Sequence, residues 1–213
     1  MPATLCSLCS RARGRRLCPA LGRFICAPCC GAARETTVDC PDACPHLRAA
    51  QAFEQQQIHP ETIEPAYPQV RVHKETLQQH APLLVALSQA LTAPSDPLRA
   101  TDNDARQALE ALTETCRTRA AGILYEQPPA NPTARLLYQR LAAVLEEYRQ
   151  NSLAGGGVTV LRDSQALEIV VFLLRLAVMR TNGRPRARAF LRYLADWLPG
   201  PSRPETARRI VLA

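Results

Sequence analysis

The sequence has no long apolar run. Its most apolar segment, residues 166–179, is too short to cross a bilayer and is interrupted by Glu168 and Arg175. The first residues also lack the apolar core of a secretory signal. We therefore expect a cytoplasmic protein that makes no contact with a membrane.

Lysine and aromatic residues are scarce as well. Lys74 is the single lysine among 26 basic residues, and Phe, Trp and Tyr together make up 5% of the chain. A GC-rich genome accounts for much of such an arginine excess, so the number of arginines does not by itself indicate phosphate binding. The aromatic residues near the C-terminal arginines, Phe190, Tyr193 and Trp197, lie at core spacing, which argues against the stacking platforms that bind single-stranded nucleic acids.

The first fifty residues have too few apolar groups to build a core. Their sizeable apolar residues are Leu5, Leu8, Leu17, Leu21, Phe24, Ile25, Val38 and Leu47. A unit of this size needs disulfides or a metal ion to hold it together. Cytosolic thiols are kept reduced, so we favour metal over disulfides.

Cysteine, by contrast, is concentrated in this segment. Eight of the nine cysteines lie between residues 6 and 44, and they include two Cys-x2-Cys pairs, each of which can close a tight turn around one ion. We predict two zinc ions and nine candidate ligands, of which eight would bind: Cys6, Cys9, Cys18, Cys26, Cys29, Cys30, Cys40, Cys44 and His46. An iron–sulfur cluster is the alternative, because thiolates also hold those clusters.

The order of these ligands resembles the small two-zinc cross-brace fingers of the B-box, MYND and HIT types, over residues 5–47. The resemblance implies that Cys6, Cys9, Cys26 and Cys29 hold one ion. It implies a second set of Cys18, Cys30, Cys40 and Cys44, and His46 is either spare or replaces Cys30. The chain departs from those families in the adjacent pair Cys29 and Cys30. The function that the resemblance implies is scaffolding through a protein partner.

The fold class that we predict is mainly α: a small N-terminal finger of β-hairpin and helix, followed by an all-α helical bundle. The expected divisions are residues 1–57 for the finger, 58–72 for a proline-rich linker, 73–200 for the helical domain and 201–213 for a tail. In the finger we expect strands at residues 21–25 and 35–38, on either side of a zinc-knuckle turn at 26–31. A helix should follow from Pro45 to about Gln57.

Caps and prolines delimit the helices of the second domain. One helix should begin near Pro82 and end before Pro94. Thr101 and Asp104 resemble a capping box, and Asn131 with Pro132 should start the next helix. Asp163 or Ser164 should cap the next helix, and Pro185 should open the last one. We expect Ile123 and Trp197 on apolar faces, and a flexible linker at residues 155–157.

Positive charge is strongest near the C-terminus. The formal net charge is +7, and residues 169–195 contain no acidic residue. Six arginines of this region are candidate nucleic-acid contacts: Arg175, Arg180, Arg184, Arg186, Arg188 and Arg192. A solvated face, or pairing with acids of the middle helices, is the interpretation that we favour. Thiolates and bound ions would bring the finger close to neutral.

No set of residues in the sequence forms a catalytic site. Cys116 lies on an apolar helix face and should pack in the core, and His59, His73 and His80 should be solvated. We therefore predict a non-enzymatic adaptor or regulatory protein that acts through protein contacts. The alternatives are a nucleic-acid-binding regulator, which would use the C-terminal arginines with Arg11, Arg13, Arg15 and Arg16, and an iron–sulfur or redox-sensing protein.

Overall fold

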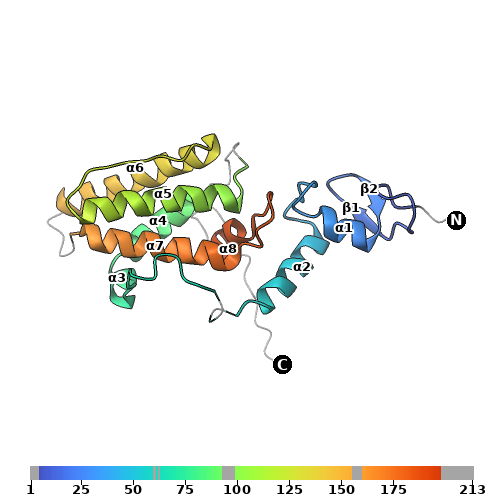
Figure 1. Cartoon of the computed structure of the whole chain (residues 1–213), viewed down its shortest axis with the longest axis horizontal. Coiled ribbons are helices and arrows are strands. Elements are labelled where there is room, and N and C mark those ends of the chain that lie inside the picture. The colour runs from blue at the N-terminus through green and yellow to red at the C-terminus, as the bar shows by residue number, and fades with distance from the viewer. Residues whose placement is uncertain (1–4, 60, 62, 93–98, 155–159, 198–213) are drawn as a thin grey trace, which may run out of the picture.

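Helices dominate the computed structural model, which describes residues 5–59, 61, 63–92, 99–154 and 160–197. These residues form eight α-helices and a two-stranded antiparallel sheet. A small lobe contains β1, β2 and α1, and helix α2 joins it to a larger helical lobe (Figure 1). The predicted fold class, mainly α with an N-terminal hairpin, is confirmed.

The hairpin of the small lobe differs from the predicted one. Strand β1 (Arg16–Cys18) pairs with β2 (Arg23–Ile25), with Arg16 opposite Ile25 and Cys18 opposite Arg23. Gly22, at φ +63°, provides the left-handed residue of the turn between them. The predicted strand at 35–38 is wrong, because this segment contributes only an isolated bridge between Arg34 and Val38.

A short helix replaces the predicted zinc-knuckle turn. Helix α1 (Ala27–Ala33) begins directly after Cys26, with a proline in its first turn. Proline is tolerated there because the first helical N–H groups have no intrahelical partner. Helix α2 (Pro45–Gln56) lies within one residue of the predicted bounds.

The helical lobe is built around α5 (Asp102–Ala120), which packs against α6 (Pro132–Ala154) and α7 (Asp163–Arg180). Helix α4 (Ala81–Thr92) packs on α6 and α8 (Ala189–Trp197), and α3 (Lys74–Gln79) packs on α7. Fully buried side chains fill the space between them: Leu83, Leu87, Leu109, Leu112, Leu137, Leu141, Ile169, Leu173, Leu174, Phe190 and Leu194. Each contributes about 1.5–3 kcal/mol by its burial.

Two predicted helix starts are confirmed by their caps. Asp104 N donates to Thr101 Oγ1 at 3.3 Å, and Thr101 N donates to an Asp104 carboxylate oxygen at 2.8 Å. Thr133 N donates to Asn131 Oδ1 at 2.9 Å at the start of α6. Helix α7 is different, because its capping residue is Arg162, whose N–H donates to the Gln165 side chain at 3.0 Å.

The last helix begins later than predicted, at Ala189 instead of Pro185. The buried carboxylate of Asp102 accepts hydrogen bonds from Phe190 N and Leu191 N at 3.1 and 3.2 Å, which caps α8 at this point. Trp197, at its end, is 55% exposed and is not a core residue. The predicted tail at 201–213 and the glycines at 155–157 lie outside the described residues.

Three further predictions concern single side chains. Cys116 is buried among leucines, as predicted, whereas Ile123 lies beyond the end of α5 and is exposed. His80 is fully buried and therefore not solvated; its Nδ1 lies 3.2 Å from Tyr148 Oη. No helix in the described part of the chain is long and apolar enough to cross a membrane.

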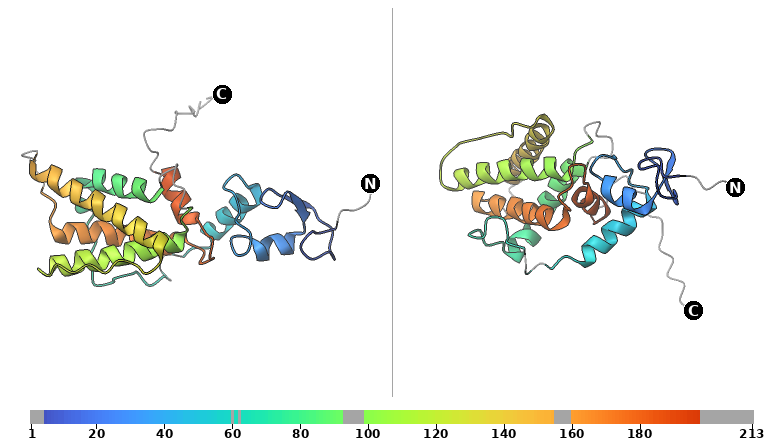
Figure 2. Two further views of the ribbon diagram at one scale, coloured as in Figure 1. Left: turned by 90° about the horizontal axis from the view of Figure 1, so that it is seen from above. Right: turned by 45° about the vertical axis from the view of Figure 1, so that its right-hand side comes forward.

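The two lobes meet at α2 and at the segment around α8. Figure 2 shows from two further directions that α8 and the loop before it face the small lobe and α2. Arg186 N donates to Glu35 O at 2.9 Å, which joins this loop directly to the backbone after α1. The small lobe is thus held against the helical lobe by contacts far apart in the sequence.

Candidate metal centre

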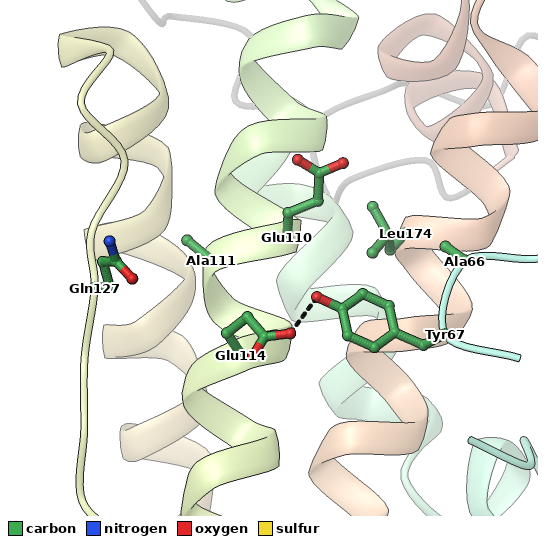
Figure 3. Close-up of a pocket in the computed structure, with 7 residues that line it drawn as sticks. All are labelled: Ala66, Tyr67, Glu110, Ala111, Glu114, Gln127 and Leu174. Atoms are coloured by element: carbon green, nitrogen blue, oxygen red, sulfur yellow. Dashed lines mark hydrogen bonds between the residues drawn. The ribbon is translucent and has the colours of Figure 1, made fainter. Parts of the chain in front are cut away.

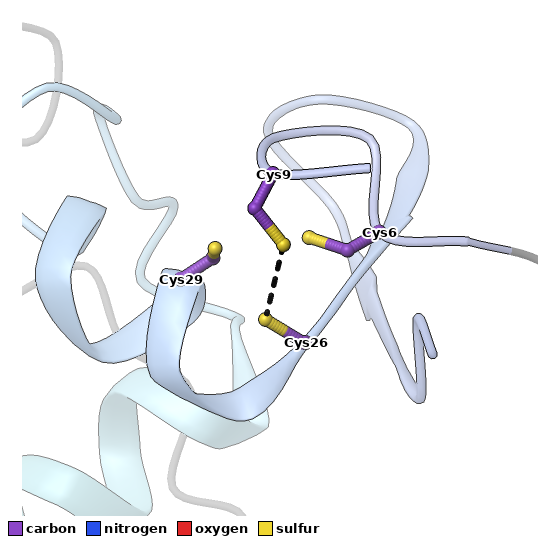
Figure 4. Close-up of side chains that lie close together, drawn as sticks. All are labelled: Cys6, Cys9, Cys26 and Cys29. Carbon is purple, nitrogen blue, oxygen red and sulfur yellow. Dashed lines mark hydrogen bonds between the residues drawn. The ribbon is translucent and has the colours of Figure 1, made fainter. Parts of the chain in front are cut away.

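Four cysteines of the small lobe converge on one point. The sulfur atoms of Cys6, Cys9, Cys26 and Cys29 all lie within 4.8 Å of one another (Figure 4). These are the four residues that the cross-brace resemblance assigns to one ion. They form the single group of three or more candidate ligands at this spacing within the described ranges.

The backbone holds each pair of cysteines in a tight turn. Ser10, at φ +53°, closes the first turn by donating its N–H to Cys6 O at 2.8 Å. Cys6 N donates to Ala12 O at 2.8 Å and fixes the start of the same loop. The second turn is the beginning of α1, where Cys30 N donates to Cys26 O at 3.0 Å. The knuckle therefore takes a helical form at the second pair.

The spacing of the sulfur atoms fits a tetrahedral ion. Zinc–sulfur bonds of about 2.3 Å in tetrahedral geometry place sulfur atoms about 3.8 Å apart, and Cys9 Sγ lies 4.0 Å from Cys26 Sγ. Cys6 and Cys26 are buried, and Cys9 and Cys29 are half-buried. Four protein ligands fill a tetrahedral shell, which is the arrangement of a structural zinc site.

The thiols of this cluster have strongly unequal acidities. Burial raises the pKa of Cys6, but hydrogen bonds from the backbone of Cys26, Cys9 and Leu8 outweigh it and lower the pKa to about 6. Hydrogen bonds shared with the Cys26 and Cys9 side chains raise the pKa of Cys29 to about 12. Four neighbouring thiols cannot all ionise without a cation between them, and a divalent metal would supply that charge.

The five remaining candidate ligands surround one small cavity. Its volume is about 20 Å³, enough for a single water molecule or ion. It is bordered by the apolar side chains of Ile25, Val38 and Leu47 and by all five candidates: Cys18, Cys30, Cys40, Cys44 and His46. Their ligand atoms do not form a second group at the spacing of the first.

Three of the C-terminal arginines bind the small lobe and α2. Arg184 donates to Gly31 O at 3.0 Å and to Arg34 O at 2.6 Å. Arg188 pairs with Asp39 at 2.8 Å. Arg192 donates to the side chains of Gln51 and Asp42.

Two other arginines fix the segments around α7. Arg175 donates to the carbonyl oxygens of Ala66, Tyr67 and Val70 at 2.9, 2.8 and 2.7 Å, and so ties the predicted linker to the helix. Arg180 donates to Gln55 of α2, and its guanidinium lies 4.1 Å from the ring centroid of Tyr193. The expected pairing with acids of the middle helices is therefore wrong for these residues, which bond to the small lobe, α2 and the linker.

Arg186 differs from the other five candidate nucleic-acid residues because its side chain is exposed. The other five are half-buried, and their guanidinium groups make the contacts just described. A phosphate would have to compete with these intramolecular bonds. Nucleic-acid binding by these arginines stays a prediction.

Glu35 is a buried acidic residue that the sequence did not single out. It is 2% exposed and adopts φ +53°, which is unusual for a residue with a side chain. Its carboxylate accepts from Gln51 Nε2 at 3.1 Å and from Asn182 Nδ2 at 2.8 Å. Glu35 therefore joins the small lobe, α2 and the loop after α7, and only the folded chain brings these partners together.

A second cavity, of about 360 Å³, lies in the helical lobe between α5, α7 and the segment before α3 (Figure 3). Its two acids already have partners. Glu110 pairs with Arg106 at 2.6 Å, and Glu114 accepts from Tyr67 Oη at 2.5 Å. A hydrogen bond from Arg117 lowers the pKa of Glu114, so this carboxylate stays ionised and weakly basic. Burial and the hydrogen bond to Glu114 raise the pKa of Tyr67, the one hydroxyl-bearing residue that lines the cavity, so this hydroxyl stays protonated.

Comparisons of the chain with protein-family models, with curated proteins and with solved structures find no match. The geometry supports a mainly helical protein with a cysteine-rich segment. In this segment, the side chains of Cys6, Cys9, Cys26 and Cys29 could hold a metal ion such as zinc.

Proposed function

We propose that this chain is a non-enzymatic zinc protein that acts as an adaptor or regulator through protein contacts. The observation that carries the proposal is the convergence of four cysteine thiols within 4.8 Å. Because four thiolates complete the shell of a tetrahedral ion, the metal would have no open position for a substrate. Its role would be to fold the small lobe, to which zinc contributes about 10–16 kcal/mol in comparable modules.

A second zinc ion would occupy the cavity bordered by Cys18, Cys30, Cys40, Cys44 and His46. The five side chains come from β1, α1, the loop before α2 and α2 itself. An ion there would therefore connect the hairpin to the helix that leads into the helical lobe. Four of the five would bind the ion: Cys18, Cys40 and Cys44, with either Cys30 or His46 as the fourth ligand.

The adaptor role is supported by how the small lobe is attached. Arginines of the helical lobe bind Asp39, Asp42 and the end of α1, so the metal-binding lobe is presented as a fixed part of the molecule. A rigid surface binds a partner at a smaller entropic cost than a flexible one. The arrangement thus suits a protein that displays one lobe to a partner.

Metal analysis of cysteine variants tests the two sites separately. Native mass spectrometry should find two zinc ions per chain in the unaltered protein and in Cys116→Ser, whose thiol is buried in the helical lobe. Cys6→Ser and Cys40→Ser should each retain one ion. A cobalt-substituted protein should show the thiolate charge-transfer absorption of a cysteine-rich tetrahedral site.

Two outcomes would contradict the proposal in different ways. An unaltered protein with one ion, and no further loss in Cys40→Ser, would remove the second site but leave the first. A brown protein with iron and sulfide in place of zinc would overturn the zinc assignment and favour the iron–sulfur alternative.

A further inference from the structure

The hairpin of the small lobe has one buried face and one exposed apolar face. Leu17 and Phe24 are opposite each other across β1 and β2, so their side chains point to the same side. Cys18 and Ile25, their neighbours along each strand, point to the other side and are buried. Leu17 and Phe24 are nevertheless 56% and 43% exposed. The outer side of the hairpin is therefore only partly covered within the described part of the chain.

Other exposed apolar residues lie close to this pair. Ser7 N donates to Phe24 O at 3.0 Å, which places the loop containing Leu5 and Leu8 along the free edge of β2. Both leucines are exposed, as is Leu21 in the turn between the strands. We call Leu5, Leu8, Leu17, Leu21 and Phe24 the hairpin face. An apolar patch on a lobe that already lacks apolar residues for its core indicates a binding surface.

The position of Phe24 is restricted by its close contact with Gly14. A Cβ added to Gly14 would lie 2.9 Å from Phe24 Cβ and 3.1 Å from its carbonyl carbon. The backbone at Gly14 is therefore in close contact with Phe24, and Cys26 lies two residues after Phe24. A metal ion held by Cys6, Cys9, Cys26 and Cys29 would fix the loop that contains Leu5 and Leu8, and also the end of β2 that follows Phe24.

The charges around the hairpin face are of one sign. Residues 5–34 contain six arginines and no acidic residue, and Arg11, Arg13 and Arg15 are exposed. The first acids along the chain, Glu35, Asp39 and Asp42, are bonded to residues of the helical lobe at the other end. A zinc ion bound by four thiolates leaves a net charge of about −2, but this charge lies on largely buried sulfur atoms. The exposed rim is basic.

We propose that the hairpin face binds an acidic protein segment that carries bulky apolar side chains. The apolar side chains would cover Leu17 and Phe24, and the carboxylates would pair with the rim arginines. An apolar centre with a polar rim is the usual anatomy of a protein interface. A nucleic acid would satisfy the arginines but would leave the exposed leucines uncovered. The proposal rests on the proposed function, because it names the surface through which an adaptor would act.

Binding of two matched synthetic peptides to the whole metal-loaded chain tests the proposal. One peptide consists of glutamate and leucine in amphipathic order, and the other has lysine in place of glutamate. Fluorescence anisotropy should show binding of the acidic peptide and none of the basic one. Leu17→Ser and Phe24→Ser should each weaken binding about tenfold or more, because each removes the burial of a large side chain. Phe53→Ser, which alters an exposed aromatic residue of α2, should leave binding unchanged.

Salt and metal content separate the remaining outcomes. Added salt, or Arg11→Ser with Arg13→Ser, should weaken binding of the acidic peptide several-fold. Equal binding of both peptides, or no effect of Phe24→Ser in protein that retains its zinc, would overturn the hairpin face while leaving the zinc proposal intact. Tighter binding of a single-stranded oligonucleotide, lost with the arginines but not with Phe24→Ser, would assign the surface to nucleic acid instead. Metal-free but folded protein would contradict the proposed function itself.

Discussion

The contact between Glu35 and Asn182 offers a quantitative test of how the two lobes are joined. Glu35→Ala removes the acceptor for Asn182 Nδ2 and for Gln51 Nε2. Asn182→Ala removes the donor to Glu35 and to Glu54, which lie at 2.8 and 3.1 Å. A hydrogen bond to a charged group contributes about 1.5–3 kcal/mol, so each variant should lose about 2–3 kcal/mol of unfolding free energy.

The double variant separates the contribution of the hydrogen bond between Glu35 and Asn182 from the contributions of the other bonds that each residue makes. Because the bond between the two side chains can be lost once only, the double variant should be less destabilised than the sum by about 1.5 kcal/mol. The strained backbone at Glu35 does not disturb this difference, since an alanine there keeps the same φ in the single and the double variant. The coupling free energy therefore reports on the contact alone.

Urea unfolding of metal-loaded protein, followed by circular dichroism, measures these free energies if the two lobes unfold together. Hydrogen exchange of the Arg186 amide, which donates to Glu35 O, provides a local measurement that does not need that condition. Arg106 and Glu110 form a matched control on the exposed side of α5, where the coupling should not exceed about 0.5 kcal/mol. Additive effects of Glu35→Ala and Asn182→Ala would refute the bond between Glu35 and Asn182 as a link between the lobes.

Three further predictions concern single residues. Gly14→Ala should destabilise the small lobe by about 1–3 kcal/mol through its close contacts, whereas Gly31→Ala, in α1 with open space around it, should be neutral or stabilising in thermal unfolding. Burial raises the pKa of Cys116 to about 12, so iodoacetamide should label it in urea but not in the folded chain; equal labelling would contradict its core position. Burial lowers the pKa of His80 from 6.5, so the stability that His80 contributes should be complete above pH 6.5 and be lost as the pH falls through the lowered value. His80→Gln should show a shallower pH dependence in urea unfolding, and an unchanged slope would contradict this assignment.

Local chemistry explains why the helices were predicted well. The free N–H groups at two helix starts are satisfied within one turn, by Thr101 with Asp104 and by Asn131 before Pro132. Because these caps are local, they can be predicted without knowledge of the rest of the fold. The Cys-x2-Cys pairs are equally local, since each closes its own turn. Local turns identify each pair, but the expectation that Cys6 and Cys26 share one ion came from the resemblance to cross-brace fingers.

The errors arise where distant contacts decide the structure. Strand β1 (Arg16–Cys18) is three residues long, which is too short for an alternating pattern to mark it as a strand. The start of α8 depends on Asp102, which lies on another helix. Histidine gives no sign of burial in the sequence, and His80 is buried beside Tyr148 of α6, 68 residues further along the chain. The C-terminal arginines were expected on a solvated face because their partners are distant in the sequence; Asp39, the partner of Arg188, lies about 150 residues away.

The most direct test of the account is hydrogen exchange of the whole chain before and after removal of its metal by a chelator. The metal-loaded protein should protect amides in both lobes. After chelation, protection should be lost in residues 5–44 and retained in α4 to α7, because the small lobe has no sufficient core of its own whereas the helical lobe has. Unchanged protection of the small lobe in metal-free protein would contradict the central claim that bound metal holds it together.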